Sequence, residues 1–131
     1  MPVELEMVLR ILLAAALGAV IGFQRGKAAK SAGLRDLILI STGAALFTVV
    51  SIYGFAADTS RVAAGIVTGI GFLGAGVIIR QGEGIVKGLT TASTIWIVAG
   101  LGLAAGAGMY LIATVTTLVI LLVLLLPRRI A

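Results

Sequence analysis

The feature that most constrains this chain is a long stretch near its C-terminus without any charged residue. No Asp, Glu, Lys or Arg occurs between Leu89 and Leu126. A single helix of that length would reach about 57 Å, far more than the roughly 30 Å thickness of a bilayer's hydrocarbon core. Glycines cluster from Gly102 to Gly108, and glycine is unfavourable inside a helix. We therefore predict two membrane-spanning helices, at residues 90–105 and 109–126, joined by a tight turn.

The composition of the whole chain agrees with a membrane protein. Hydrophobic residues make up 60% of the 131 residues and charged residues only 11%, whereas a soluble domain has about 25% charged residues. Three further apolar stretches are long enough to cross a bilayer. We therefore predict one domain over residues 1–131, an all-α polytopic membrane protein with five transmembrane helices, at about residues 5–24, 34–55, 62–80, 90–105 and 109–126.

The distribution of positive charge predicts the orientation of these helices. With five spans, every Lys and Arg except Arg10 and Arg61 lies on the same side of the membrane. Basic residues in short loops accumulate on the cytoplasmic side. We therefore expect the N-terminus outside and the C-terminus in the cytoplasm. Four spans would place Arg128 and Arg129 outside, so this rule favours five.

Several classes of function are disfavoured by the residues that the chain lacks. It has no Cys and no His, which removes thiolate and imidazole catalysis and the usual zinc ligands. The sequence from Gly69 to Gly74 matches G-x-G-x-x-G, but it lies inside an apolar span rather than between a strand and an amphipathic helix. The net charge of +5 resides in loops between spans. We expect no enzymatic activity, no cofactor and no nucleic-acid partner.

Glycines at helical spacing predict close contacts between helices. Small residues let helix backbones approach each other in lipid. Such contacts can form between helices of one copy or between helices of neighbouring copies. We expect a homo-oligomer, with a dimer favoured. We expect Leu at position 69 or 74 to abolish activity through lost packing. The predicted helix-packing glycines are Gly18, Gly22, Gly65, Gly69, Gly71, Gly74 and Gly76.

Charged and hydroxyl residues are predicted to gather at the cytoplasmic ends of the spans. Asp36 also fits a simpler role at a helix N-terminus, where an acid complements the backbone dipole. The hydroxyls of Thr90 and Thr91 also fit helix capping, which we favour. A pair between Arg80 and Asp36 is about as plausible as two separately solvated ends. The members of this predicted cluster are Arg25, Arg35, Asp36, Arg80, Thr90 and Thr91.

On the opposite side, two pairs of charges are candidates for ion pairs. Glu6 and Arg10 are four residues apart on one helix face, so they can pair, or Arg10 can instead extend to the headgroups. Asp58 and Arg61 share the short turn before the third span, where Asp58 or Ser60 can cap the helix. A magnesium path needs carboxylates, and Asp36 is only a weak metal candidate.

The chain resembles the transmembrane domain of the MgtC/SapB family of bacterial inner-membrane proteins. The most specific of the matching segments are 69–80, Gly-Ile-Gly-Phe-Leu-Gly-Ala-Gly-Val-Ile-Ile-Arg, and 88–92, Gly-Leu-Thr-Thr-Ala. They occur in family order and cover nearly the whole chain. The other matching segments are residues 18–25, 32–35, 43–51 and 58–64, followed by Trp96 and residues 106–108.

This resemblance implies a regulatory protein of the bacterial inner membrane, linked to growth in low magnesium and to virulence. It implies action by helix contacts with another membrane complex, such as the F-type ATP synthase. The alternative is a transporter or channel for Mg²⁺ or another small ion. Many members carry a cytoplasmic C-terminal domain, so this chain looks like a short form or a truncated piece.

Two positions depart from the family pattern. The family usually has Glu-Arg at the end of the first span, where this chain has Gln24-Arg25. It usually has Thr after Ala-Gly-Leu-Arg, where this chain has Asp36. Whether Asp36 replaces the missing glutamate stays open at this point.

Overall fold

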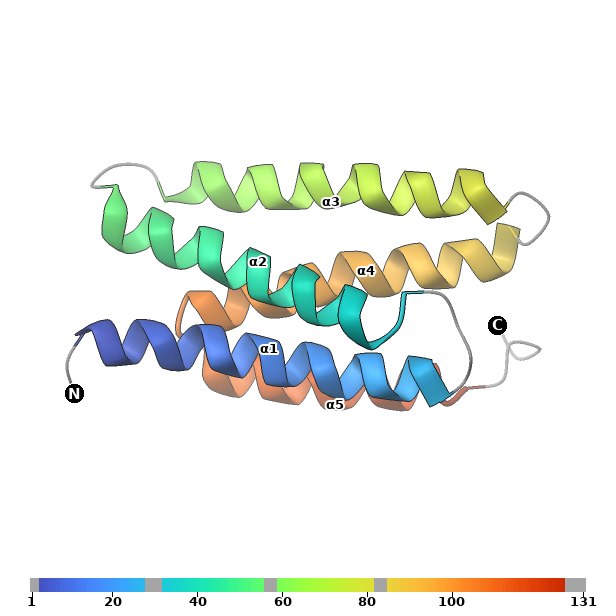
Figure 1. The fold of residues 1–131 in the computed structure, drawn as a ribbon, viewed down its shortest axis with the longest axis horizontal. Coiled ribbons are helices and arrows are strands. Elements are labelled where there is room, and N and C mark those ends of the chain that lie inside the picture. The colour runs from blue at the N-terminus through green and yellow to red at the C-terminus, as the bar shows by residue number, and fades with distance from the viewer. Residues whose placement is uncertain (1–2, 28–31, 56–58, 82–84, 127–131) are drawn as a thin grey trace.

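The computed structural model describes residues 3–27, 32–55, 59–81 and 85–126, which form five α-helices and the turns next to them (Figure 1). The predicted all-α class is confirmed, and most helix bounds fall within a few residues of the expected ones. The helices are α1 (Val3–Lys27), α2 (Leu34–Gly54), α3 (Ser60–Gln81), α4 (Ile85–Gly106) and α5 (Tyr110–Leu124).

The start of α4 differs most from the sequence-based expectation. Residues 81–88 were expected to form a loop, but α4 begins at Ile85 and runs through Gly88. Gly88 is buried, and a glycine inside a helix is tolerated where close packing depends on it. Thr90 and Thr91 therefore lie inside the helix rather than at its first turn. Helix capping is therefore not their role, whereas the other part of that expectation, hydroxyl bonding to the helix backbone, is seen at Thr94, which donates to the carbonyl oxygen of Thr90.

Four of the described helices are long and apolar enough to cross a membrane. Their apolar parts are Val3–Gly26, Leu34–Gly54, Ser60–Ile78 and Gly88–Gly106. The fifth helix, α5, is also apolar but has 15 residues, which corresponds to about 22 Å at 1.5 Å per residue. Its length is therefore below that of a typical membrane span.

The helices differ widely in how much of their surface the bundle covers. In Figure 1, α3 lies along one side of the molecule, α1 and α5 lie together on the other side, and α2 and α4 lie between them. Within their apolar parts, 56% of α4 is buried but only 11% of α3. The apolar core includes Ile21, Leu37, Val98 and Leu101. The helix α4 is thus the centre of the bundle, and α3 is its most exposed long helix.

Glycines create the closest helix contacts, on both sides of α2. A methyl group at Gly22 of α1 would lie 2.7 Å from the Cα atom of Leu34. A methyl group at Gly106 of α4 would lie 2.8 Å from the carbonyl oxygen of Ala45. Gly18 and Gly102 also lie against α2, near Ser41. These glycines let α1, α2 and α4 pack as one tight unit.

The glycines of α3 behave differently. A methyl group at Gly74 would lie 3.4 Å from the Cβ atom of Ala92, an ordinary contact with α4. At Gly65, Gly69, Gly71 and Gly76 nothing lies within 4 Å of such a methyl group. Within one copy, these four glycines therefore make no close helix contact with the described residues.

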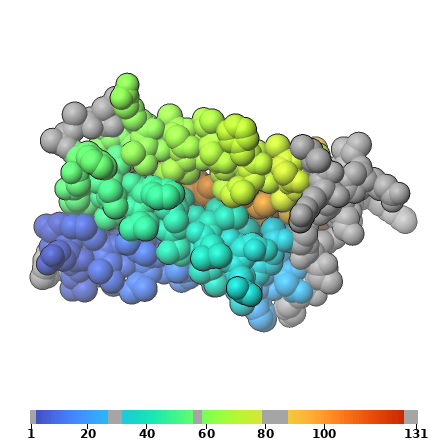
Figure 2. Space-filling view, turned by 45° about the horizontal axis from the view of Figure 1, so that its top comes forward, coloured from blue at the N-terminus to red at the C-terminus, as the bar shows by residue number. Residues whose placement is uncertain are grey.

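A groove runs between α2 and α3 and has α4 as its floor. In Figure 2, orange atoms of α4 are visible between the cyan-to-green α2 and the yellow-green α3. The groove has a volume of about 560 Å³ and only apolar residues line it. The contact between α2 and α3 is therefore sparse, and α3 is held mainly by α4.

Candidate functional site

A buried arginine joins α1 to α4 near the end of α1. The Arg25 side chain is only 2% exposed. Its Nη2 atom donates a hydrogen bond to Thr91 Oγ1 at 2.7 Å, and its Nη1 atom lies 3.5 Å from Thr94 Oγ1. The Thr94 hydroxyl donates to the carbonyl oxygen of Thr90 at 2.8 Å. We call Arg25, Thr91 and Thr94 the Arg25 cluster.

Local sequence explains why these side chains meet. Arg25 lies in the last turn of α1, where the helix dipole favours a positive charge. Thr91 and Thr94 are three residues apart, so they present their hydroxyls on one face of α4. A guanidinium has five N–H donors and burying it is costly unless they are bonded. The two hydroxyls therefore compensate part of the cost of burying the Arg25 charge.

The structure brings together only part of the predicted cytoplasmic cluster. It joins Arg25 to Thr91, with Thr90 half-buried beside them. Arg35 and Asp36 are exposed in the first turn of α2, and within the described part of the chain neither bonds to the Arg25 cluster. Arg80 lies near the end of α3, and its side chain is outside the described residues. The pair between Arg80 and Asp36 therefore stays a prediction.

Thr94 is a member of the Arg25 cluster that sequence reasoning did not select. The sequence contained a signal for it, because Thr91 and Thr94 share a helix face. The predicted helix over residues 90–105 already contains both threonines, so this signal was available from the sequence. With the helix expected to begin at residue 90, the hydroxyls looked like capping groups.

A second polar cluster lies at the opposite end of the bundle. Arg10 Nη1 donates to the carbonyl oxygen of Gly106 at 3.0 Å, and Arg10 Nη2 lies 3.8 Å from Glu6 Oε1. The Tyr110 hydroxyl donates to Glu6 Oε1 at 2.9 Å. The Arg10 guanidinium carbon also lies 5.3 Å from the centre of the Tyr53 ring. These five residues, the Arg10 cluster, connect α1, α2, α4 and α5.

The turn between α4 and α5 explains the position of Arg10. Met109 N–H donates to Ala104 O at 2.9 Å and Gly108 N–H to Ala105 O at 3.0 Å, which is the Schellman pattern. Gly108 has a φ of +83°, and a side chain there would also lie 2.9 Å from Arg10 Nη2. The carbonyl oxygen of Gly106 accepts a hydrogen bond from the Arg10 guanidinium. The first helix thus caps the end of the fourth.

The other predicted pair on this side is described only in part. Arg61 is exposed in the first turn of α3. Asp58 lies outside the described residues, so its pairing with Arg61 stays a prediction. Ser60 is the first residue of α3, in keeping with a helix that starts near the expected turn.

The charges of the described residues do not form a cation site. In this part of the chain, no three His, Cys, Asp or Glu side chains come together. Asp36 is exposed, and Glu6 lies beside Arg10 and Tyr110. The Arg25 charge, which is buried inside the bundle, would repel a divalent cation. The weak metal candidate Asp36 thus gains no second carboxylate here.

Long apolar helices, with charged side chains near their ends, define the class of this chain: a multi-pass helical membrane protein. The family model described as MgtC family matches residues 11–131. The chain belongs to the MgtC family. The resemblance inferred from the sequence is confirmed, and with it the link to proteins named for magnesium.

Three curated relatives show how close the similarity is. "Putative magnesium transporter YhiD" of Escherichia coli (strain K12) is 45% identical over 128 residues, which cover 91% of this chain and 59% of the relative. "Protein MgtC" of Salmonella typhimurium (strain LT2) is 45% identical over 124 residues, 95% of this chain and 53% of the relative. "Protein SapB" of Bacillus subtilis (strain 168) is 39% identical over 129 residues, 92% and 56%.

The chain spans a little more than half the length of the curated relatives that it matches. Activities of those whole proteins are therefore not transferred to it as findings. No solved structure matches the chain significantly.

Proposed function

We propose that this chain is a regulatory protein of the bacterial inner membrane that acts by helix contacts with another membrane protein. The observation that carries the proposal is the exposure of α3, whose apolar part is only 11% buried. In lipid, helices associate through small residues that allow close approach. A long helix with open glycines is therefore a suitable contact surface for a partner helix.

The outward face of α3 offers a row of small residues. Ala64, Thr68, Gly71 and Ala75 follow one another at spacings of three and four, and all four are exposed. Phe72, which is 77% exposed, stands beside them. We call these four small residues the outward α3 face. Their spacing matches the small-residue rows by which membrane helices pack.

The family resemblance supplies a candidate partner and a setting. The proposed partner is a membrane complex such as the F-type ATP synthase, in a bacterium that grows in low magnesium or inside a host. A homo-oligomer, most simply a dimer, is a second use of the same face. We propose no enzymatic activity for the chain, because it has no Cys and no His, which removes the commonest pairs of nucleophile and base.

Transport of Mg²⁺ is the second candidate function, and the name of the YhiD relative favours it. The electrostatics of this chain weigh against it. Magnesium is bound by carboxylates and keeps its waters, whereas the described interior of this bundle holds the cation of Arg25. A flux assay separates the two functions. Purified protein in liposomes loaded with a Mg²⁺ dye is expected to give no flux above empty liposomes.

In-membrane cross-linking tests the regulatory proposal directly. A photoreactive amino acid at Gly71 or Ala75 of the outward α3 face is expected to capture a second membrane protein, identified by mass spectrometry. The matched control carries the same group at Leu118 of α5, which is 58% exposed on another side of the bundle. Equal adducts from both positions, or adducts only with lipid, would count against the proposal.

A further inference from the structure

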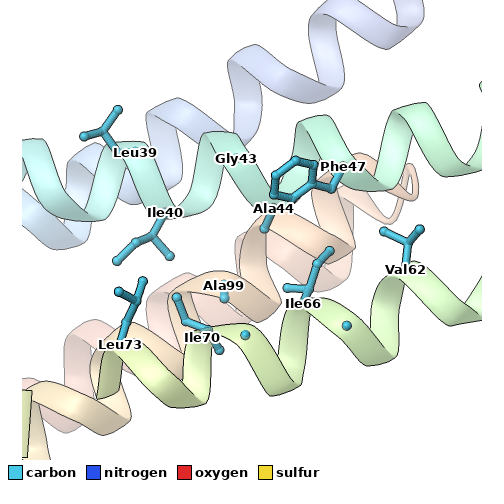
Figure 3. A pocket seen from close by; sticks show the side chains of 12 residues that line it. Leu39, Ile40, Gly43, Ala44, Phe47, Val62, Ile66, Ile70, Leu73 and Ala99 are labelled. Atoms are coloured by element: carbon cyan, nitrogen blue, oxygen red, sulfur yellow. The ribbon is translucent and has the colours of Figure 1, made fainter. Parts of the chain in front are cut away.

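The two sides of α3 differ in the groups that they offer to a neighbour. Toward α2, the groove of Figure 3 is lined only by apolar residues, with the side chains of Ile40, Ile66 and Ile70 around it. Along the contact between α3 and α4 lie two further hollows, and Trp96 of α4 lines both of them. Trp96 therefore stands between these two hollows, and it is the only tryptophan of the chain.

Trp96 lies near the middle of a membrane span. It is about 12 Å from Gly88 and about 15 Å from Gly106, the two ends of the apolar part of α4. Its side chain is 54% exposed, and its indole N–H forms no hydrogen bond with the described residues. Tryptophan is usually enriched at the membrane surfaces, where water and headgroups accept this bond. At mid-span the donor has an acceptor only if another protein surface supplies one.

A suitable acceptor lies one turn away on the same helix. Ser93 is exposed and lines the hollow nearer to the start of α4, and its hydroxyl also forms no hydrogen bond with the described residues. Helical side chains lean toward the N-terminus of their helix. The Trp96 indole therefore extends toward the depth of Ser93, about 4.5 Å away along the axis. Between two parallel copies, the indole of one reaches the level of the serine of the other.

The exposed residues of α4 form a continuous stripe. Leu89, Ser93, Trp96 and Gly100 follow one another at spacings of four, three and four, and all four are exposed. This is the repeat by which two helices pack along a coiled-coil seam. A methyl group at Gly100 would meet nothing within 4 Å. The small residues on either side of Trp96 therefore leave room for the side chains of a neighbouring helix.

The same surface carries a large protruding side chain and a hollow. Gly71 and Gly74 of α3 line this hollow together with Ser93. A two-fold symmetric contact needs both features on each copy, because the same patch must give and receive. A lipid tail could fill the hollow but would offer no acceptor to the indole. A second copy satisfies both requirements with residues that this chain itself provides.

We propose that a second copy of the chain packs on this surface, in parallel and about a two-fold axis along the bilayer normal. The Trp96 indole of each copy enters the hollow beside Gly71 and Gly74 of the other and donates its N–H to the other copy's Ser93 hydroxyl. Gly71 also belongs to the outward α3 face, so the dimer covers part of the surface proposed for the regulatory partner. The proposal rests on the proposed function only in this overlap.

Because Trp96 is the single tryptophan, the unaltered chain can be tested. The purified protein is reconstituted in phosphatidylcholine vesicles that carry bromine in the middle of the acyl chains, at rising ratios of lipid to protein. Bromine quenches a tryptophan that it contacts. We expect Trp96 to be protected at high protein density and to lose most of its fluorescence on dilution, as dimers separate. Strong quenching at every ratio would show that Trp96 faces lipid, and would overturn the dimer.

Single cysteines test the geometry of the contact, because the chain has no Cys of its own. Gly100→Cys lies on the proposed seam and is expected to give disulfide-linked dimers under mild oxidation in unbrominated vesicles, since a disulfide needs Cβ atoms about 3.8 Å apart. The matched control is Leu118→Cys, which is exposed on α5 and is expected to give few dimers. Equal yields at the two positions would contradict the interface.

A double-mutant cycle tests the hydrogen bond itself. Trp96→Phe removes the donor but keeps an aromatic ring, and Ser93→Ala removes the acceptor. In the Gly100→Cys background, each is expected to lower the dimer yield about three- to tenfold, as for an interhelical hydrogen bond. The double variant is expected to lower it no further. Fully additive losses would show that the two side chains act separately and would overturn the proposed bond.

Two further outcomes separate this proposal from the regulatory one. If the purified protein forms no dimers and Trp96→Phe removes adducts with a different membrane protein at Gly71, that protein occupies the surface and the second copy does not. Ala64 belongs to the outward α3 face but lies outside this hollow. A photoreactive group at Ala64 that captures no other protein, with the dimer intact, would contradict only the regulatory proposal.

Discussion

At the scale of single residues, two arginines hold the ends of this bundle by different means. Arg25 is buried and bonded to threonine hydroxyls of α4. Arg10 caps a helix carbonyl and lies beside a carboxylate and an aromatic ring. In both cases an arginine of α1 is hydrogen-bonded to a residue of α4 that is far away in the sequence. Replacing each partner therefore tests a specific contact.

Replacing Arg10 by Gln is expected to destabilise the protein by about 1.5–3 kcal/mol, the usual effect of losing a hydrogen bond to a charged group. Thermal unfolding in detergent, followed by circular dichroism, measures the change. Arg35→Gln is the matched control, since Arg35 is exposed, and its effect is expected within about 0.5 kcal/mol. Equal stabilities of the two variants would show that the Arg10 cap contributes nothing.

Replacing Thr91 by Val removes the acceptor at 2.7 Å from the Arg25 guanidinium while keeping the shape of the side chain. We expect a loss of about 1–3 kcal/mol, because a buried donor is left poorly bonded. The control is Thr114→Val, at an exposed position of α5, and the same unfolding assay measures both variants. If Thr91→Val is as stable as the control, the hydrogen bond between Thr91 and Arg25 contributes nothing measurable to stability.

At the scale of helices, the sequence predicted existence and approximate bounds well, because charge-free apolar stretches leave few alternatives in a membrane. It did not predict where α4 begins, since Gly88 looked like a loop residue, whereas in the structure it is buried inside the helix. Nor did it separate two kinds of glycine. Gly18 and Gly22 lie against α2, whereas Gly65 and Gly69 line open space.

This difference between glycines gives a test on two helices. Gly106→Ala is expected to destabilise the protein by about 1–3 kcal/mol, because its methyl group would overlap the α2 backbone. Gly76→Ala is expected to stabilise it by up to about 1 kcal/mol through helix propensity alone. Unfolding in mixed micelles measures both. Effects of the same sign and size would contradict the distinction drawn here.

The same distinction changes the meaning of the motif at Gly69–Gly74. The sequence interpretation was a packing surface, within one copy or between copies. In the described chain only Gly74 contacts another helix, through Ala92. The remaining glycines are available to lipid or to a partner. No sequence pattern separates these outcomes, because small residues are favoured in each of them.

At the scale of the whole molecule, the sequence predicts the candidate site less well than it predicts the fold. Proximity of Arg25 to Thr91 depends on how α1 crosses α4, which no local pattern encodes. Arg35 and Asp36 were near in sequence order but are exposed. Topology is also set at this scale, because the short α5 decides whether the two ends of the chain lie on opposite sides of the membrane.

We expect reporter fusions to place the C-terminus in the cytoplasm and the N-terminus outside. A fluorescent protein fused after the last residue is expected to fluoresce, and alkaline phosphatase at the same position is expected to be inactive. Both follow from the concentration of Lys and Arg on one side in a five-span arrangement. Active phosphatase at the C-terminus would show that α5 does not cross the membrane.

The hydrogen bond between Arg10 and Gly106 also has a consequence for biosynthesis. The turn from Gly106 to Tyr110 contains no charged residue, so its polar backbone relies on a donor made near the start of translation. The contact therefore forms only when the first helix and the last hairpin are both in the bilayer. Arg10 thus ties the last hairpin to the first helix, and a chain without it is expected to hold that turn less firmly while α4 stays packed against α2.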